Sequence, residues 1–420
     1  YVTDKISSND ISLAEYVTTD CILQNKKGRE VATNLPPQPC SLIRYQRGDV
    51  LIANIRPYLK KVWFADIDGG ASPDVLVFRA KDGHSPSFLY AILLQDSFFD
   101  YVMQGTKGSK MPRGDKEQIL RYEMPTFSCS EESIGTFFLN LDRKIHLNER
   151  INRNLEAIAK QLYDYWFVQF DFPDENGRPY KSSGGEMVWN EKLKREIPFG
   201  WHCGNLFEIA VFTNGLACQK FRPKDNEVPL PVIKIREMHD GISVDTEEVT
   251  SNIPESVKVY NGDVLFSWSA SLEVMLWAYG FGGLNQHIFK VTSANDFPKS
   301  FYYFQLLDYV DVFKKMAEAR KTTMGHITQD HLQQSAIAIP DNKDIADRFE
   351  ELISPIFNQI IKLHEEILNL TKQRDKLLPL LMNGQVSVNS DLAVLYIIYG
   401  LKYQNHEREH YSGDSCENAA

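Results

Sequence analysis

The stretch of this sequence that most resembles a catalytic motif lies close to its C-terminal end. His406 and His410 flank Glu407 at the spacing by which a zinc-protease helix presents two metal ligands and a general base, and Cys416 follows. In such enzymes the helix lies inside a folded domain that supplies a further ligand. Here the motif lies in a short polar segment, so we expect adventitious metal binding at most and assign no metal site. A zinc peptidase carried by the tail stays the alternative that metal analysis of the purified chain would test.

Basic side chains form the second group of candidate functional residues. The formal net charge is -10, yet Lys and Arg are concentrated at residues 26–61, 107–121, 220–236 and 314–321. Lys and Arg bind phosphates, and Arg, Asn, Gln, Ser and Thr can also read base edges. A single basic cluster can equally be a solvated charged surface with no nucleic-acid partner. Because basic clusters occur in both halves of the chain, we favour nucleic-acid contact. The candidate contacts are Lys60, Lys107, Lys110, Arg113, Lys220, Arg222, Asn285, Gln286, Arg320, Lys321, Thr322 and His326.

Two interpretations stay open for the Asn285-Gln286-His287 group. It resembles a metal-binding or base-reading set, but it begins the strand-like segment NQHIFKV. A single histidine in a strand is more often a hydrogen-bonded structural residue than a residue that contacts a base. We therefore favour the structural interpretation and keep base contact as the alternative.

Several kinds of function are disfavoured by motifs that the sequence does not contain. It has no Gly-x-x-x-x-Gly-Lys-Ser/Thr loop, no Gly-x-Gly-x-x-Gly motif and no Gly-x-Ser-x-Gly elbow. Its six cysteines include no Cys-x-x-Cys pair, which favours reduced thiols in the cytoplasm. The longest apolar run, Leu392 to Leu401, is too short to span a bilayer. We therefore expect a non-catalytic cytoplasmic binding protein without a cofactor and without a membrane association.

Two long helices are the elements that must position the candidate contacts. Apolar positions separated by alternating steps of four and three form the seam of a coiled coil. Two series of ten such positions occur in the same register, 215 residues apart. The first is Ile134, Phe138, Leu141, Ile145, Asn148, Asn152, Leu155, Ala159, Leu162 and Trp166, and the second is Phe349, Ile353, Ile356, Ile360, Leu363, Ile367, Leu370, Arg374, Leu377 and Leu381.

The chain thus supplies both partners of the predicted coiled coil. The seam residues that we expect to pack between the helices are Leu141, Ile145, Leu155, Leu162, Ile356, Ile360, Leu370 and Leu377. Asn148 and Asn152 look like defects in the seam, but a buried polar residue there commonly fixes the register and the choice of partner.

The globular stretches before the two helices repeat each other. Gly48-Asp49-Val50-Leu51 returns as Gly262-Asp263-Val264-Leu265, and Gly69-Gly70 returns as Gly282-Gly283. Asp115, Gln118 and Pro125 return as Asp330, Gln333 and Pro340. Matches at nearly one offset over this length indicate an internal duplication.

These patterns predict an α+β protein with two duplicated domains and two long helices that pair antiparallel. Within the first domain we expect one helix over Ser87–Val102, and we expect Ser128 and Glu131 to form a capping box at the start of the first long helix. The predicted divisions are a first domain at 1–130, a helix at 131–170, a linker at 171–197, a second domain at 198–343, a second helix at 344–384 and a tail at 385–420.

Three segments resemble a known family. INRNLEAIAKQLYDYWFVQFDFP, IPFGW and QRDKLLPLLMNGQVSV are similar to the helical regions of the DNA-specificity subunit of Type I restriction-modification enzymes, and the duplicated layout resembles that subunit over nearly the whole chain. The stretch after Val388 does not resemble this family.

The resemblance implies two target recognition domains, each reading one half of a bipartite sequence in double-stranded DNA. It implies that the helices set the gap between the half-sites. Two adenine methyltransferase subunits would dock around the helical regions, and a restriction and translocase subunit would join them. The S-adenosylmethionine and ATP sites would lie on those partners. The alternative is a generic two-domain DNA-binding scaffold or regulator, and an adjacent adenine methyltransferase gene would separate the two.

Overall fold

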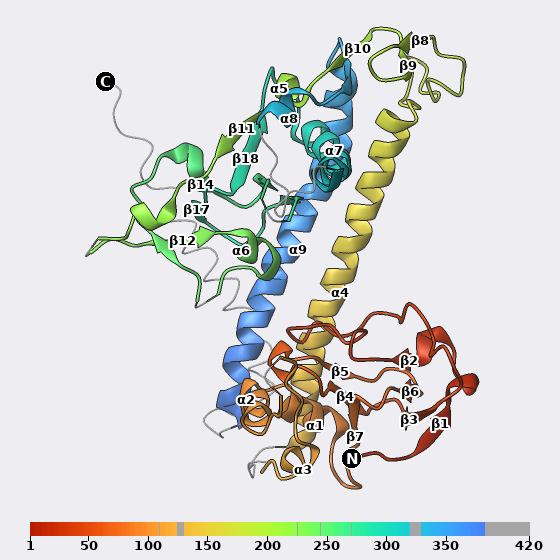
Figure 1. Ribbon diagram of the computed structural model, residues 1–420, viewed down its shortest axis with the longest axis vertical. Helices are drawn as coiled ribbons and strands as arrows, with labels where there is room; N and C mark the ends of the chain where they lie inside the picture. The colour runs from red at the N-terminus through yellow and green to blue at the C-terminus, as the bar shows by residue number, and fades with distance from the viewer. Residues whose placement is uncertain are drawn as a thin grey trace. The chain divides into compact units, whose positions relative to one another are not determined.

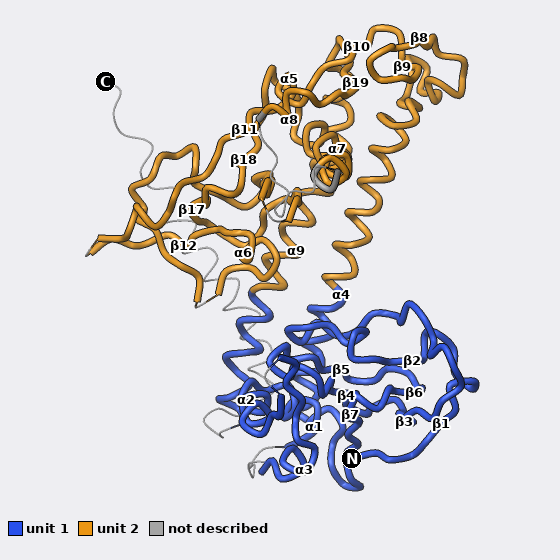
Figure 2. Tube along the Cα trace, viewed as in Figure 1, with its two compact units in different colours: residues 1–147, 369–420 blue, residues 148–368 orange. Residues whose placement is uncertain are grey.

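The structure, a computed structural model, describes residues 1–108, 110–123, 130–224, 226–243, 245–269, 271–319 and 329–382. The chain divides into two compact units (Figure 2). Unit 1 contains residues 1–147 and 369–420, and unit 2 contains residues 148–368. The division cuts both long helices, so each unit includes part of each. In the described part of the chain, no helix combines the length and the apolar character needed to cross a membrane.

In its described residues, unit 1 contains two small sheets and three α-helices besides its share of the long ones (Figure 1). The first sheet has the order β1-β3-β6-β2, with β1 at Lys5–Ser7, β3 at Ser41–Tyr45, β6 at Gly69–Ala71 and β2 at Tyr16–Val17. The second has the order β5-β4-β7, with β5 at Val62–Phe64, β4 at Val50–Ala53 and β7 at Val75–Phe78. The helices are α1 at Pro86–Leu93, α2 at Asp96–Gln104 and α3 at Lys116–Ile119.

Unit 2 repeats this plan and adds a hairpin. The hairpin pairs β8, Met187–Asn190, with β9, Arg195–Pro198. One sheet has the order β11-β18-β15-β16, at Ala210–Asn214, Ile288–Ser293, Val264–Ser267 and Glu273–Leu276. Another has the order β13-β12-β17-β14, at Glu248–Val249, Leu230–Ile233, Gly282–Leu284 and Lys258–Val259. The remaining elements are the pair β10, Trp201–Gly204, with β19, Ile337–Pro340, and the helices α5 at Leu206–Ile209, α6 at Ile235–Asp240, α7 at Lys299–Ala319 and α8 at Gln329–Gln333.

The repeated Gly-Asp-Val-Leu segments form the same turn in each unit. Gly48 and Gly262 both have a φ of +91°, a left-handed conformation that glycine adopts at little cost. The Asp49 Oδ2 atom accepts from the backbone N–H of Gln46 at 2.8 Å, and the Asp263 Oδ2 atom accepts from that of Tyr260 at 2.8 Å. Each aspartate also pairs with a cation from the next strand of its sheet, Asp49 with Arg79 and Asp263 with Lys290. The duplication read from the sequence is therefore a duplication of local structure.

The repeated glycine pairs lie where the backbone of a neighbouring segment approaches closely. A Cβ atom on Gly69 would lie 2.2 Å from the Glu15 carbonyl oxygen, and one on Gly282 would lie 2.7 Å from that of Pro231. In both units this glycine strand runs parallel to one neighbour, β6 with β2 and β17 with β12. Only residues without a side chain allow this approach.

The two long helices are α4, Glu131–Tyr163, and α9, Asp344–Met382. A π-helical turn at Asp164–Val168 follows α4. The α4 helix begins after Ser130, whose Oγ atom accepts from the N–H of Ser133 at 3.4 Å. The predicted cap Ser128 lies outside the described residues. The α9 helix continues through Pro379, although proline commonly kinks or ends a helix, and the predicted end at residue 384 lies outside the described residues.

The single helix predicted over Ser87–Val102 is wrong, because it is divided into α1 and α2. Gln95 between them is extended, with φ -66° and ψ 144°. This change of direction buries Phe98 and Phe99 and places Asp96 beside two lysines. Apolar periodicity continues across the break, so the pattern alone could not reveal it.

Candidate nucleic-acid interface

Polar bonds in the seam show how α4 and α9 pair within unit 2. The Asn148 Nδ2 atom donates to the Glu366 Oε2 atom at 2.7 Å, and the Asn152 Nδ2 atom lies 2.9 Å from the His364 Nδ1 atom. Rising numbers on α4 meet falling numbers on α9, so the helices are antiparallel, as expected. Both asparagines are buried, and such bonds favour one register because a slip would leave their amides unpaired.

Every residue of the two predicted seam series is buried or partly buried. Of the eight residues expected to pack between the helices, Ile145, Ile360 and Leu377 are buried, and Leu141, Leu155, Leu162, Ile356 and Leu370 are partly buried. In unit 1 the end of α9 and the start of α4 join the core formed by α1, α2 and the β5-β4-β7 sheet.

A buried ionic group lies between the two helices in unit 1. The Arg374 Nη1 atom lies 3.3 Å from the Asp142 Oδ1 atom, and the Tyr90 hydroxyl donates to the Asp142 Oδ2 atom at 2.7 Å. Burial disfavours the charge on Arg374, but Asp375 and Asp142 outweigh it and raise the pKa of Arg374. Burial also raises the pKa of Tyr90 well above its usual value, so its hydroxyl keeps its proton. Arg374, a charged member of the second seam series, therefore has a specific partner.

One residue of the predicted basic surface is instead part of the interior. The Lys26 side chain is 5% exposed, and its Nζ atom lies 2.9 Å from an Asp96 carboxylate oxygen and 3.5 Å from one of Asp375. The Lys60 Nζ atom lies 2.8 Å from the same Asp96 oxygen. Burial opposes the Asp96 charge, but the two lysines outweigh it and lower the Asp96 pKa. Lys26 thus anchors its loop to α2 and α9, because burying a lysine requires paired carboxylates.

The polar loop at 105–115 lies against the segment that follows β4. The N–H of Arg56 donates to the Pro112 carbonyl at 2.7 Å, and the N–H of Gly114 donates to the Asn54 carbonyl at 3.1 Å. Arg113 forms an ion pair with Asp74, which precedes β7. These contacts bring together residues 54–60, 72–74, 105–108 and 110–114, which we call the unit 1 surface.

The predicted contacts Lys107, Lys110 and Arg113 all lie on the unit 1 surface. Lys110 is exposed, and the Lys107 Nζ atom, 2.8 Å from Asp115, is on a side chain that is 83% exposed. Arg56 also lies there and was not singled out from the sequence. It is exposed and has a φ of +53°, a conformation that is strained for a residue with a Cβ and is often found at functional sites.

The corresponding strand ends converge in unit 2. Trp268 follows β15, and its backbone N–H donates to the His287 carbonyl at 3.3 Å. Its ring centroid lies 5.7 Å from that of His287, and its Nε1 atom donates to the Asn214 Oδ1 atom at 3.3 Å. We call segments 214–216, 268–269 and 285–287 the unit 2 surface. Trp268 occupies the place of Asn54, and Asn285–His287 occupy the place of 72–74.

The residues predicted for DNA contact in unit 2 differ in their accessibility. Asn285 is buried, and its Oδ1 atom accepts from the N–H of His287 at 3.3 Å, so its amide holds the loop together. Gln286 and His287 are partly exposed. Lys220 and Arg222 are exposed after β11. Arg320, Lys321, Thr322 and His326 lie outside the described residues, as does the tail with His406 and His410. Among the described residues no group of three or more His, Cys, Asp and Glu side chains could hold a metal ion.

Removing the charge of the 105–115 loop should weaken DNA binding and its dependence on salt. We expect Lys107→Ala, Lys110→Ala and Arg113→Ala together to flatten the plot of log K against log salt by up to about one unit per lost phosphate contact. Fluorescence anisotropy at several salt concentrations measures the slope. Alanine at Lys181, Lys192 and Lys194, which are exposed, removes the same charge elsewhere and is the control. An equal change in both variants would mean that the loop does not touch DNA.

Known proteins resemble this chain in sequence and in fold. Residues 198–371 match the family described as the Type I restriction modification DNA specificity domain. The MjaIX specificity subunit of Methanocaldococcus jannaschii, a Type I restriction enzyme subunit, is 24% identical over 396 residues, which cover 91% of this chain and 86% of that one. The HindI specificity subunit of Haemophilus influenzae is 22% identical over 435 residues, which cover 88% of this chain and 94% of that one.

A solved structure has the same fold. The S subunit of a Type I restriction-modification system from M. genitalium aligns with a TM-score of 0.53 and 13% sequence identity, over 87% of this chain and 88% of that one. The chain is similar to Type I restriction-modification DNA specificity subunits over most of its length, and residues 198–371 match the DNA specificity domain of that family.

Proposed function

We propose that this chain is the DNA-reading subunit of a Type I restriction-modification complex and has no catalytic activity of its own. The observation that carries the proposal is the duplication of the candidate surface. In each unit the segment after the central strand, β4 or β15, meets the segment after the glycine strand, β6 or β17. Two copies of one surface on one chain suit a target with two separate parts.

Under this proposal residues 1–130 and 198–343 are the two target recognition domains. The unit 1 surface offers exposed Arg and Lys side chains for phosphates and Arg56 for a base edge. The unit 2 surface offers Trp268, Gln286 and His287, which can stack on or hydrogen bond to bases. The two surfaces differ in residue type, so the two half-sites differ in sequence.

The long helices, under the same proposal, set the separation of the half-sites and dock the partner subunits. The α4 helix is continuous over 33 residues, which at about 1.5 Å per residue is roughly 50 Å, or about 15 base pairs. The partners would be adenine methyltransferase subunits and a restriction and translocase subunit, which would supply the sites for S-adenosylmethionine and ATP. The complex would act in the cytoplasm, where its DNA is.

A methyl-transfer assay tests the division of labour. We expect the purified chain to transfer no label from S-adenosylmethionine to DNA, because the cofactor sites belong to the partners. Addition of the adenine methyltransferase subunits should start transfer. Transfer by a verified single-chain preparation would overturn the non-catalytic assignment, and no transfer with partners that bind the chain would overturn the restriction-modification assignment.

A further inference from the structure

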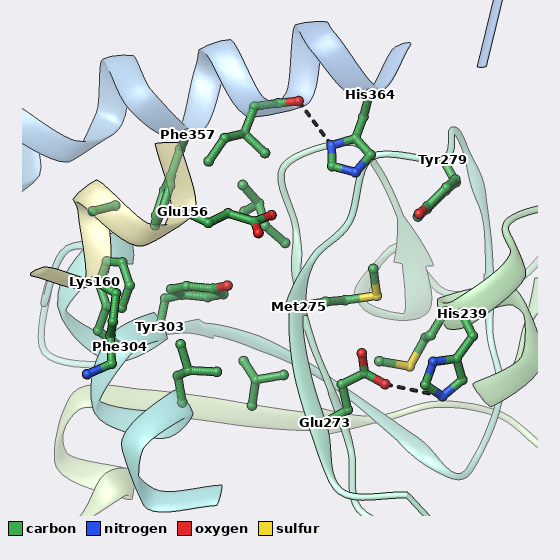
Figure 3. Close-up of a pocket in the computed structure, with 16 residues that line it drawn as sticks. Glu156, Lys160, His239, Glu273, Met275, Tyr279, Tyr303, Phe304, Phe357 and His364 are labelled. Carbon is green, nitrogen blue, oxygen red and sulfur yellow. Dashed lines mark hydrogen bonds and ion pairs between the residues drawn. The ribbon is translucent and has the colours of Figure 1, made fainter. Parts of the chain in front are cut away.

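Unit 2 contains a cavity of about 490 Å³ whose lining does not include the unit 2 surface segments (Figure 3). The helices α4, α9, α7 and α6 and the strand β16 all contribute side chains to it. A volume of this size is typical of sites for small molecules. The candidate surface segments 214–216, 268–269 and 285–287 contribute nothing to its lining.

The walls of this cavity are largely aromatic and apolar. Tyr303 and Phe304 come from α7, Phe357 from α9, and Tyr279 from the segment after β16. Met275 lies between Tyr303 and Tyr279 in Figure 3. Rings of this kind attract cations through their faces, and methylene chains pack well against thioethers and rings.

Two carboxylates enter the cavity from different elements. Figure 3 shows Glu156 extending from α4 into the space between Tyr303 and His364. Its carboxylate forms no hydrogen bond or ion pair with any described residue. The Glu156 side chain is also exposed to solvent, so the cavity is open on this side. Partial desolvation raises the Glu156 pKa, and Arg153 opposes this. The Glu273 Oε2 atom, from β16, lies 3.2 Å from the His239 Nε2 atom.

The chemistry of the lining selects against an anion. The Lys160 amino group is committed to Asp164 and to Asp308, the latter at 2.9 Å, and it points away from the middle of the cavity in Figure 3. Both carboxylates act electrostatically on Tyr279 and on Tyr303, so both lie close to the same rings. The space therefore has a negative group from each of two walls and an apolar surface between them.

We propose that this cavity binds a linear aliphatic diamine or polyamine, with one ammonium group at Glu156 and the other at Glu273. The methylene chain lies along Tyr303 and Met275, and the ammonium groups also meet the faces of the tyrosine rings. The ligand connects α4 with β16, so its binding stabilises the packing of the unit 2 sheet on the long helices. This site and its ligand are independent of DNA reading.

Calorimetry on the full chain without DNA tests the site, with putrescine as the diamine and butylamine as its monoamine counterpart. We expect putrescine to bind at a single site and butylamine to bind at least roughly tenfold more weakly, because it satisfies one carboxylate only. Glu156→Gln and Glu273→Gln should each weaken putrescine binding by a similar factor. Both changes preserve the size and shape of the side chain.

The acidic chain could also attract polyamines without a specific site, and a control separates this case. Glu351→Gln removes the same charge from an exposed position on α9 outside the cavity and should leave binding unchanged. Equal weakening by Glu351→Gln, or equal affinity for butylamine and putrescine in the unmodified chain, would overturn the proposal. The comparison of butylamine with putrescine uses the unmodified chain, so a folding defect in a variant cannot affect its result.

Discussion

Removing seven residues from each long helix is expected to shorten the gap in the DNA target by roughly three base pairs and to leave both half-sites unchanged. Seven residues of helix are about 10 Å long, and one base pair occupies 3.4 Å. The deletion removes 146–152 from α4 and 364–370 from α9. It takes out Asn148 and Asn152 together with their partners His364 and Glu366, so no seam amide is left unpaired.

The register of the seam survives this deletion. Ile145 and Leu155 become three residues apart, and Leu363 and Arg374 become four apart, so the alternation of four and three continues on both helices. Binding should weaken, because three base pairs also rotate one half-site around the duplex. Methylome sequencing of cells that carry the shortened subunit and its methyltransferase measures the gap. Duplication of the same two segments is the matched control and should lengthen the gap. Altered half-sites with an unchanged gap would contradict the proposal.

Arg374→Met is expected to destabilise unit 1 by about 3–5 kcal/mol, because it leaves the buried Asp142 carboxylate with the Tyr90 hydroxyl and the His146 ring, 3.3 Å away, but without the permanent positive charge of an arginine. Asp142 and Arg374 are 5% and 4% exposed, so water cannot replace the missing partner. Hydrogen exchange measured by mass spectrometry should show protection in unit 1 falling by a factor of roughly 100 or more. Arg348→Met changes the same residue type at an exposed position of α9 and should have little effect.

A second substitution separates the missing charge from the lost volume of the arginine. Asp142→Asn combined with Arg374→Met removes both charges and keeps an acceptor for the Tyr90 hydroxyl. Much of the lost protection should return, because the buried uncompensated charge is gone. Equal protection in the single variant and the unmodified chain would mean that the ion pair contributes nothing to the fold.

The helices could be predicted from the sequence because their signal is periodic and local. The alternation of four and three predicted both helices and their common register. It also marked Asn148 and Asn152 as exceptions and included Arg374 in the second series. The periodicity could not reveal what these residues contact, because Glu366 and Asp142 are more than 200 residues away along the chain. Nor could it reveal that Gln95 interrupts an apolar pattern that otherwise continues.

The candidate surfaces were less predictable than the helices. A cluster of lysines and arginines in the sequence indicates positive charge but not whether each side chain faces the solvent or the interior. Buried Lys26 and exposed Lys110 therefore looked alike. Arg56 gave no local signal for its left-handed backbone or for the bond from its N–H to the Pro112 carbonyl, which is far away along the chain. Trp268 was missed because its contact with His287 arises from the convergence of two strand ends. The repeated Gly-Asp and Gly-Gly pairs could have indicated that convergence.

The central claim is that each half of the chain reads its own part of a split target. Replacing residues 198–343 by the corresponding segment of the Haemophilus influenzae relative tests it most directly, with methylome sequencing of cells that also carry the adenine methyltransferase. The unmodified chain should direct methylation to one motif with two specified parts and a fixed unspecified gap, and the exchange should alter one part only. A contiguous motif, or a change in both parts after the exchange, would contradict the account.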